Sequence, residues 1–326
     1  MSTLTPGAQY PVGSPFNVTP SYSGTFIPQV WSGKLQAKFY DASTFNAISN
    51  TDYASEIKSM GDKVEIRTIP DINIQAYTAG TTLSYDVPAA ANIELVIDKG
   101  FKYSFQLNDV LEHQSDVNLM EMFSNDAAQQ LRTTIDRECF LATFNQGDAA
   151  NSGANAGRVS ASYNLGTDNT PFPLTPSNVL SLITSCSSVL DEQNIPNDNR
   201  FMVMSPVDRQ ILMNSNLANA QFIGDSQSIL RNGRIGMIDR FELYVSNLLP
   251  QAAAGNTWGN TTTQSGAAKR RAIVFGHTKA ITFASQITKM ETLRNQVDFG
   301  DLVRGLQVYG RKVVFPKGLG FASVVS

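Results

Sequence analysis

The sequence predicts an α+β fold, and three features of the chain indicate it. Extended segments with alternating apolar residues dominate residues 61–105, and the longest helical pattern follows in residues 115–144. From Thr175 onward, helical and extended patterns alternate in a mixed block. With 326 residues the chain can bury a sizeable core, as one elaborate domain or as two to three subdomains.

Bulk composition excludes several classes of protein. The chain carries 25 Lys and Arg against 28 Asp and Glu, a net charge of −3, so any contact with nucleic acid is expected to be local. The apolar runs are too short for a membrane span and the N-terminus has no signal-peptide pattern, so we expect neither feature. Cys139 and Cys186 occupy apolar positions of helical patterns, which predicts buried side chains and no disulfide framework.

The first 33 residues contain no charged side chain and are rich in Gly, Pro, Ser and Thr. Such a segment cannot bury enough apolar surface to fold alone. It nevertheless carries regularly spaced aromatic residues, namely Tyr10, Phe16, Tyr22, Phe26 and Trp31. We therefore predict an arm (residues 1–33) that becomes ordered by lying across another surface; the alternative is a disordered tail.

A short helix and a long β excursion are expected after the arm. Within residues 34–60, apolar residues at helical spacing predict one amphipathic helix, and they are Leu35, Phe39, Ala42 and Phe45. The excursion (residues 61–105) has period-two segments on both sides of a turn-rich centre at residues 79–91. A two-stranded hairpin of this length is marginal alone in water, so we expect another chain to cover it.

The pattern of residues 115–144 predicts a helix about 45 Å long, and Ser115 can cap its N-terminus. Its apolar stripe recurs every three or four residues and comprises Met120, Phe123, Ala127, Leu131, Ile135, Cys139 and Ala142. We expect this stripe to be core rather than a cofactor site. The glycine-rich stretch after Phe144 predicts a flexible loop.

The mixed block predicts a helix that starts at Thr175, with Pro176 at its first position, and stops before Pro196. The strings RFMVMS and SPVDRQILMNS predict a buried strand and a second helix. In GRIGMIDRFELYVSN, residues 233–247, the alternation of Phe241, Leu243 and Val245 predicts a half-buried strand. Further strands are expected in RAIVFG, AITFAS, QITKMETL and GLQVYGRKVVFPKG.

No catalytic or metal-binding constellation is recognisable. His113 and His277 are the only histidines, and neither lies beside a nucleophile or second ligand at useful spacing. Asp298 and Asp301, in the string DFGD, are interpreted as a solvated or salt-bridged loop rather than a cation site. We therefore expect no enzyme activity and no cofactor or metal.

The order of these elements, with several local strings, resembles the major capsid proteins of tailed phages with the Hong Kong 97-type fold. The strings are GDKVEIRTIPDINIQAYTAG, FKYSFQLND, IDRECFLATF, LDEQNIPNDNRFMVMSP, GRIGMIDRFELYVSN, FGHTKAITFA and VRGLQVYGRKVV. The resemblance covers the chain from about Phe26 onward. Each string alone is weakly specific, and their order carries the similarity.

The resemblance implies a division of the chain into the domains of that fold. It makes residues 1–33 the N-terminal arm, 34–60 a helical region, 61–105 the E-loop and 106–166 the spine helix with its following loop. Residues 167–267 become the axial domain, in which GRIGMIDRFELYVSN would be a central strand. Residues 268–326 return through the peripheral and axial domains.

The implied function is self-assembly, through hexamers and pentamers, into an icosahedral head that encloses double-stranded DNA. Implied partners are identical subunits, a portal protein and a separate scaffolding protein, with a decoration or stapling protein possible, weak contacts to packaged DNA and no membrane. The implied location is the virion, after assembly in the host cytoplasm. We expect intersubunit contacts at Tyr10, Phe16, Phe26, Trp31, Tyr77, Tyr85, Arg294 and Arg304.

Two other classes of function remain open. An encapsulin-like shell of the same fold would enclose cargo protein instead of DNA. A carbohydrate-binding module or enzyme would use the uncharged loops near Asn145 and Gly255 as its site.

Overall fold

The computed structural model describes residues 43–53, 63–67, 92–109, 119–215, 237–253, 257–259, 269–296 and 299–325, with the single positions 72, 74, 76, 79, 80 and 85. The chain divides into two units, residues 1–38 and 39–326, and every described residue belongs to the second. The predicted arm, His113, Ser115 and Asp298 lie outside the described residues. So do Gly233 and Gly236 of the string GRIGMIDRFELYVSN.

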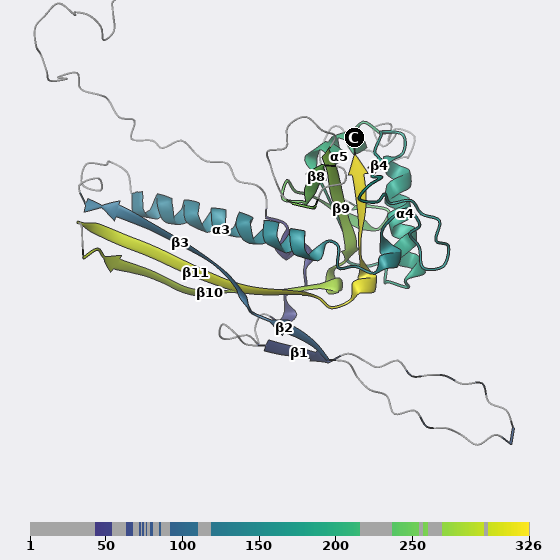
Figure 1. The fold of residues 1–326 in the computed structure, drawn as a ribbon, viewed down its shortest axis with the longest axis horizontal. Coiled ribbons are helices and arrows are strands. Elements are labelled where there is room, and N and C mark those ends of the chain that lie inside the picture. Colours follow the sequence, from purple (N-terminus) through teal and green to yellow (C-terminus); the bar gives the residue numbers. More distant parts are fainter. Residues whose placement is uncertain are drawn as a thin grey trace, which may run out of the picture. The chain divides into compact units, whose positions relative to one another are not determined.

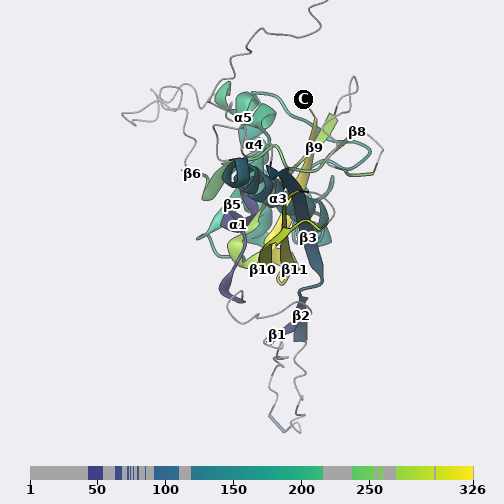
Figure 2. The same cartoon turned by 90° about the vertical axis from the view of Figure 1, so that its left-hand side faces the viewer.

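A long helix lies along a three-stranded antiparallel sheet (Figure 1). The sheet has the order β10 (Ile281–Arg294), β11 (Gly300–Val313) and β3 (Lys99–Asn108), and the helix is α3 (Leu119–Thr143). Figure 2 shows α3 end-on above these strands. Gly305 leaves room on β11 for the ring of Tyr103 on β3, because a side chain at position 305 would collide with that ring.

The excursion begins from a second, smaller sheet. Strands β1 (Lys63–Arg67) and β2 (Asn92–Val96) pair antiparallel, with Arg67 opposite Asn92 at the outer end. Ile66 and Leu95 are buried against β10 and β11. These contacts fix β1 and β2, which form the base of the excursion, to the larger sheet. At its inner end the two-stranded pairing stops at Lys63 and Val96, short of the predicted end at Phe105. Phe101, Tyr103 and Phe105 belong to β3 and pair with β11 instead of with β1.

The mixed block forms a seven-stranded sheet. Its main order is β4 (Phe172–Pro173), β12 (Leu319–Val325), β9 (Lys269–His277), β5 (Arg200–Met204), β7 (Phe241–Val245) and β6 (Met237–Ile238), while β8 (Gln251–Ala253) pairs with β9. All five residues of β5 are buried, as predicted for RFMVMS. The expected central strand of GRIGMIDRFELYVSN is β7, which instead is second from the edge among the described strands, with the two-residue strand β6 beside it.

Two helices pack with this sheet. Helix α4 (Val179–Glu192) begins three residues after Pro176, with Asn178 as its N-cap, so the predicted start was too early. The Asn178 side chain accepts the Thr175 N–H, which holds residues 175–178 in a turn before the helix. Helix α5 (Pro206–Met213) starts in a capping box in which Ser205 and Asp208 satisfy each other's backbone N–H groups.

The chain crosses between the two large sheets at two short helical turns. η4 (Thr278–Ala280) joins β9 to β10, and η5 (Pro316–Gly318) lies between β11 and β12. The two turns touch, because Gly318 packs directly on Ala280. One buried cluster includes residues of both sheets, among them Val274 of β9 and Phe283 of β10. The crossing is therefore part of the core.

Two further elements complete the described fold. A helix of one turn, α1 (Phe45–Ile48), packs on α3 and β10, and a short 3-10 helix, η2 (Ala149–Asn151), follows α3. No helix among the described residues is long and apolar enough to cross a membrane.

Candidate assembly surface

The apolar stripe of α3 is buried over only half of the helix. In the C-terminal half, Ile135, Cys139 and Phe140 are at most 3% exposed. In the N-terminal half, Phe123 is 40% exposed, and Met120 and Leu131 are only half-buried. The expectation that the whole stripe is core was therefore wrong for the N-terminal half, which leaves apolar surface for another contact.

An open groove follows this uncovered half of the helix. It has a volume of about 380 Å³ and lies between α3 and β3. Aromatic and aliphatic side chains form much of its wall: Phe101, Tyr103, Phe105, Phe123 and Leu131. A second hollow of about 230 Å³ lies on the other side of the helix, against Met290 of β10 and Leu306 of β11. We call the first the α3–β3 groove.

A polar clamp fixes the other half of α3 to the sheet. Glu138 accepts hydrogen bonds from the Tyr309 hydroxyl at 2.8 Å and from Arg311 Nε at 3.0 Å. Burial alone would raise the pKa of Glu138, but the hydrogen bonds from Arg311 and Tyr309 hold that pKa below its usual value. The carboxylate is therefore charged at neutral pH and ties α3 to β11.

The excursion presents apolar side chains to solvent. Ile72, Ile74 and Tyr85 are 71%, 92% and 87% exposed. At the base, the Lys63 ammonium bridges Glu65 and Glu94 across β1 and β2. The excursion thus combines a fixed base with a row of uncovered apolar residues, which is unusual for a surface that remains in water.

The turn between β10 and β11 is held by ion pairs within the chain. Arg294 pairs with Asp109, at the end of β3, and with Asp301 at 3.2 Å. Arg304 pairs with Glu291 through two donors, at 2.5 and 2.8 Å. Beside them Phe299 is 76% exposed. Asp301 is ion-paired, as the DFGD string was interpreted, but it belongs to strand β11 and not to a loop.

The predicted contact residues divide into two groups. Tyr10, Phe16, Phe26, Trp31 and Tyr77 lie outside the described residues. Tyr85 is exposed, and Arg294 and Arg304 are partly exposed at their ion pairs. Their role between subunits stays a prediction.

Sequence reasoning did not select Ile72, Ile74, Phe123 or Phe299 as contact residues. The signal for the isoleucines was present, because they alternate in a segment with no apolar cover. Phe123 was assigned to the core because a helical stripe does not reveal where its cover ends. Phe299 gave no signal of its own.

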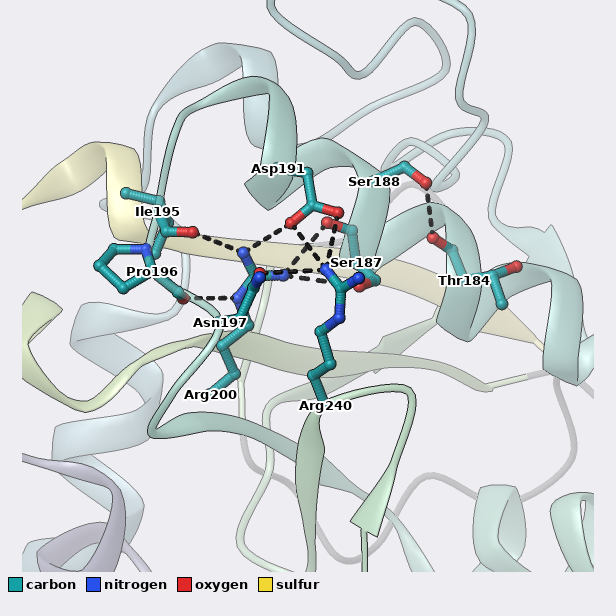
Figure 3. Close-up of polar contacts among 9 residues, drawn as sticks. All are labelled: Thr184, Ser187, Ser188, Asp191, Ile195, Pro196, Asn197, Arg200 and Arg240. Atoms are coloured by element: carbon teal, nitrogen blue, oxygen red, sulfur yellow. Dashed lines mark hydrogen bonds and ion pairs between the residues drawn. The ribbon is translucent and has the colours of Figure 1, made fainter.

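In the seven-stranded half of the molecule, one carboxylate organises a loop cluster (Figure 3). Asp191 of α4 pairs with the buried Arg200 at 2.7 Å and with the half-exposed Arg240 at 3.2 Å. Asp239 and Arg240 form the two-residue turn between β6 and β7, with φ of 44° and 70°. Positive φ at both positions defines the hairpin turn that best fits twisted strands, and Asp191 holds Arg240 in this costly conformation.

Among the described residues, no three His, Cys, Asp or Glu side chains gather to hold a metal. Burial raises the pKa of both cysteine thiols, which makes Cys139 and Cys186 poor nucleophiles. The exposed apolar surfaces and the α3–β3 groove are thus the features that call for a partner.

Comparison with known families decides what kind of protein carries these surfaces. The family model described as phage capsid protein matches residues 92–320. The chain belongs to this phage capsid protein family. The capsid protein also shares its fold with solved phage structures, and that fold is of the Hong Kong 97 type.

Three of these structures illustrate the likeness. A chain from Mycobacterium phage Che8 has a TM-score of 0.72 and 24% identity, covering 92% of the capsid protein and 98% of the phage chain. The capsid of cyanophage P-SCSP1u gives 0.67 and 15%, with 95% and 98% covered. The head of Helicobacter pylori bacteriophage KHP40 gives 0.60 and 11%, with 96% and 99% covered. No curated protein sequence shows significant similarity to the capsid protein.

Proposed function

We propose that this capsid protein assembles, through hexamers and pentamers, into an icosahedral head that encloses double-stranded DNA. In this assembly the excursion of one copy lies over the α3–β3 groove of its neighbour, and the arm lies across another copy. The carrying observation is that apolar side chains are exposed at two separate places in the described subunit, at Ile72, Ile74 and Tyr85 of the excursion and at Phe123 of the groove.

The direction of the strands supports a contact between copies. Strand β2 leads from Asn92 at the outer end of the excursion base to Val96, and β3 continues from Lys99 to Asn108. Figure 1 shows β2 and β3 on one diagonal, with α3 beside β3. The groove lies beside β3, so the outer end of the base, at Arg67 and Asn92, is at the opposite end of this line from the groove of its own chain. A head-to-tail contact forms a ring when the rotation between neighbouring copies closes, and many modest contacts then add up around a shell.

Further partners follow from the same proposal. A separate scaffolding protein and a portal protein would act during assembly in the host cytoplasm, and a decoration or stapling protein would act on the finished head. Contacts with the packaged DNA would be local and weak, because the net charge of the chain is −3.

The experiment pairs one disruptive change with a matched conservative change. Ile74→Asp places a charge on a side chain that is 92% exposed, so the free energy of unfolding of the subunit should hardly change. It should prevent particles from forming, whereas Ile74→Leu should assemble like the original protein. Phe123→Asp in the groove should act like Ile74→Asp.

Light scattering and the nucleic-acid content of purified particles are the readouts. Particles hundreds of ångströms across that contain DNA support the proposal. Particles filled with protein cargo would indicate a compartment shell of the same fold. A small oligomer from the unaltered chain, with no particles under any condition, would contradict assembly itself.

A further inference from the structure

The short helix α1 is capped by a side chain from another element. The side chain of its own N-cap residue, Thr44, makes no capping hydrogen bond. Instead the carboxylate of Asp136 on α3 accepts the N–H of Thr44 at 2.8 Å and the N–H of Phe45 at 3.1 Å, 92 and 91 residues away in sequence. The Ser43 hydroxyl donates a third hydrogen bond to it. Two N–H groups at the start of α1 that have no partner within the helix are therefore satisfied by α3.

Two further contacts attach the same segment to the body of the subunit. The ring of Phe45 meets Phe140 of α3 and Phe283 of β10 edge-to-face, with centroids 5.2 and 5.6 Å apart. Asn50 donates its N–H to the carbonyl of Ile281 and accepts the N–H of Phe283, at 2.8 and 2.9 Å. We call residues 44–50 the arm root, because they follow the arm and include Phe45, the last apolar residue of the predicted helix.

The attachment of the arm root is incomplete in its polar contacts. The hydroxyls of Thr44, Ser49 and Thr282 are buried without a protein partner among the described residues. A buried hydroxyl without a partner costs free energy, and a helix of one turn has little stability of its own. The arm root is therefore held by its two core residues, Phe45 and Ile48, and by a few polar contacts, of which the Asp136 carboxylate makes the charge-assisted ones.

Helix α3 does not depend on the arm root in the same way. Glu138, two residues after Asp136, is clamped by Arg311 and Tyr309 of β11. Ile135, Cys139 and Phe140 bury the same half of the helix in the main core. Loss of the arm root would therefore leave α3 on its sheet.

We propose that Asp136 is a positioning residue that latches the arm root onto helix α3, and that this latch can open without unfolding the subunit. The latch fixes where the segment before Ser43 leaves the subunit, and it couples that exit point to movements of α3 against β10. This role in assembly rests on the proposed function, because it requires the arm to contact neighbouring copies. The latch itself does not require it.

Hydrogen exchange of the Thr44 and Phe45 amides in the unassembled full-length subunit tests the latch directly. Asp136→Ala removes the acceptor, so protection of these two amides should fall by about tenfold or more while amides of β9 stay protected. Asp136→Asn keeps an oxygen acceptor and should retain most of the protection. Glu138→Gln is the matched control on the same helix and should leave both amides protected.

A fourth variant tests the latch in the strengthening direction. Thr44→Val removes one unpartnered buried hydroxyl while nearly preserving shape, so it should raise the protection of the arm root several-fold. This variant remains informative if Asp136→Ala does not yield folded subunit.

Several outcomes would overturn the latch. Unchanged protection in Asp136→Ala would do so, as would equal losses in Asp136→Asn and Asp136→Ala or in Glu138→Gln. Particle yield is measured on the same variants. If exchange responds as expected but yield does not fall in Asp136→Ala, the latch stands and its link to assembly fails. If the unaltered chain forms no particles, the proposed function fails independently of the exchange result.

Discussion

The Lys63 ammonium lies 3.0 Å from the Glu94 carboxylate, across the two strands that form the base of the excursion. The hydrogen bonds that the ammonium donates to Glu94 and then to Glu65 raise the pKa of Lys63, so the amine stays protonated. Lys99 follows Val96, which pairs with Lys63 at the inner end of the base, and lies 3.6 Å from Asp98. Both lysines are therefore paired within their own chain.

This pairing predicts particles without covalent cross-links between excursions. Residues 64–98 contain no lysine, and an isopeptide bond needs a neutral lysine amine that can reach the next subunit. Particles boiled in detergent should give one band near 35.5 kDa on a denaturing gel. A ladder of covalent oligomers would contradict the prediction.

Acidification should tighten the arm root. Burial raises the pKa of Asp136 above its ordinary value of 3.8, although hydrogen bonds from Ser43, Phe45 and Thr44 oppose this shift. Release exposes the carboxyl to water and restores the lower pKa, so the docked state binds the proton more tightly. Docking should therefore strengthen as the pH falls toward the raised pKa and be weakest above it.

The pH dependence of amide protection at Thr44 and Phe45, corrected for intrinsic exchange rates, measures this effect. Protection should rise from about pH 7 to about pH 4 in the original chain and stay flat in Asp136→Asn. A parallel slope in both proteins would assign the effect to another group.

His277 should make the subunit less stable in mild acid. Burial is the main cause that lowers its pKa below the ordinary 6.5, and its Nδ1 accepts the Lys279 N–H at 3.0 Å. The unfolded chain binds the proton more readily, so the stability from neutral His277 is complete above about pH 6.5 and declines as the pH falls toward the lowered pKa. Urea unfolding at a series of pH values should show this decline, and His277→Asn should reduce it. An unchanged slope in the variant would refute the assignment.

Charge reversal at the β10–β11 turn should affect assembly more than folding. Arg294 and Arg304 make exposed ion pairs within the chain, and such pairs contribute little to stability. Arg294→Glu and Arg304→Glu should therefore change the melting temperature slightly and reduce the particle yield strongly. Equal losses of stability and yield would show that these arginines serve only their own subunit.

Removal of residues 1–25 should leave a folded subunit that assembles poorly. This part of the arm has no charged residue and offers aromatic side chains as its main handles, so its contribution must come from docking. Circular dichroism tests folding and sedimentation tests the shells. Shells as stable as those of the full chain would make this part of the arm a passive tail.

Local sequence patterns predicted individual helices and strands well, but they predicted poorly which strands pair with each other. The apolar run of β5 and the box of Ser205 and Asp208 that starts α5 are local signals, and the structure confirms the strand and the helix. Phe105 pairs with β11, about 200 residues later in the chain. The alternation of apolar residues in 101–105 does not indicate which strand this partner is. The same limit explains why β7 was expected at the centre of its sheet.

The candidate surface was predictable only where exposure leaves a sequence signal. Tyr85 lies in the turn-rich centre of the excursion and is exposed, while its contact with another subunit stays a prediction. Phe123 and Ile135 occupy equivalent positions of one stripe, yet only Ile135 is covered by the subunit. That difference arises where the core ends beneath α3, which is a property of the whole fold. The capping of α1 by Asp136 likewise joins residues that no local rule connects.

The crossing at η4 and η5 has a mechanical consequence. Two connections run side by side between the sheets, and Gly318 rests on Ala280 where they touch. Tension that pulls the two sheets apart is therefore shared by two covalent strands in parallel, and it loads their ladders of hydrogen bonds in shear, along the strand direction, instead of opening them one bond at a time. A shell built from such subunits would resist stretching best along the line that joins the two large sheets of each subunit.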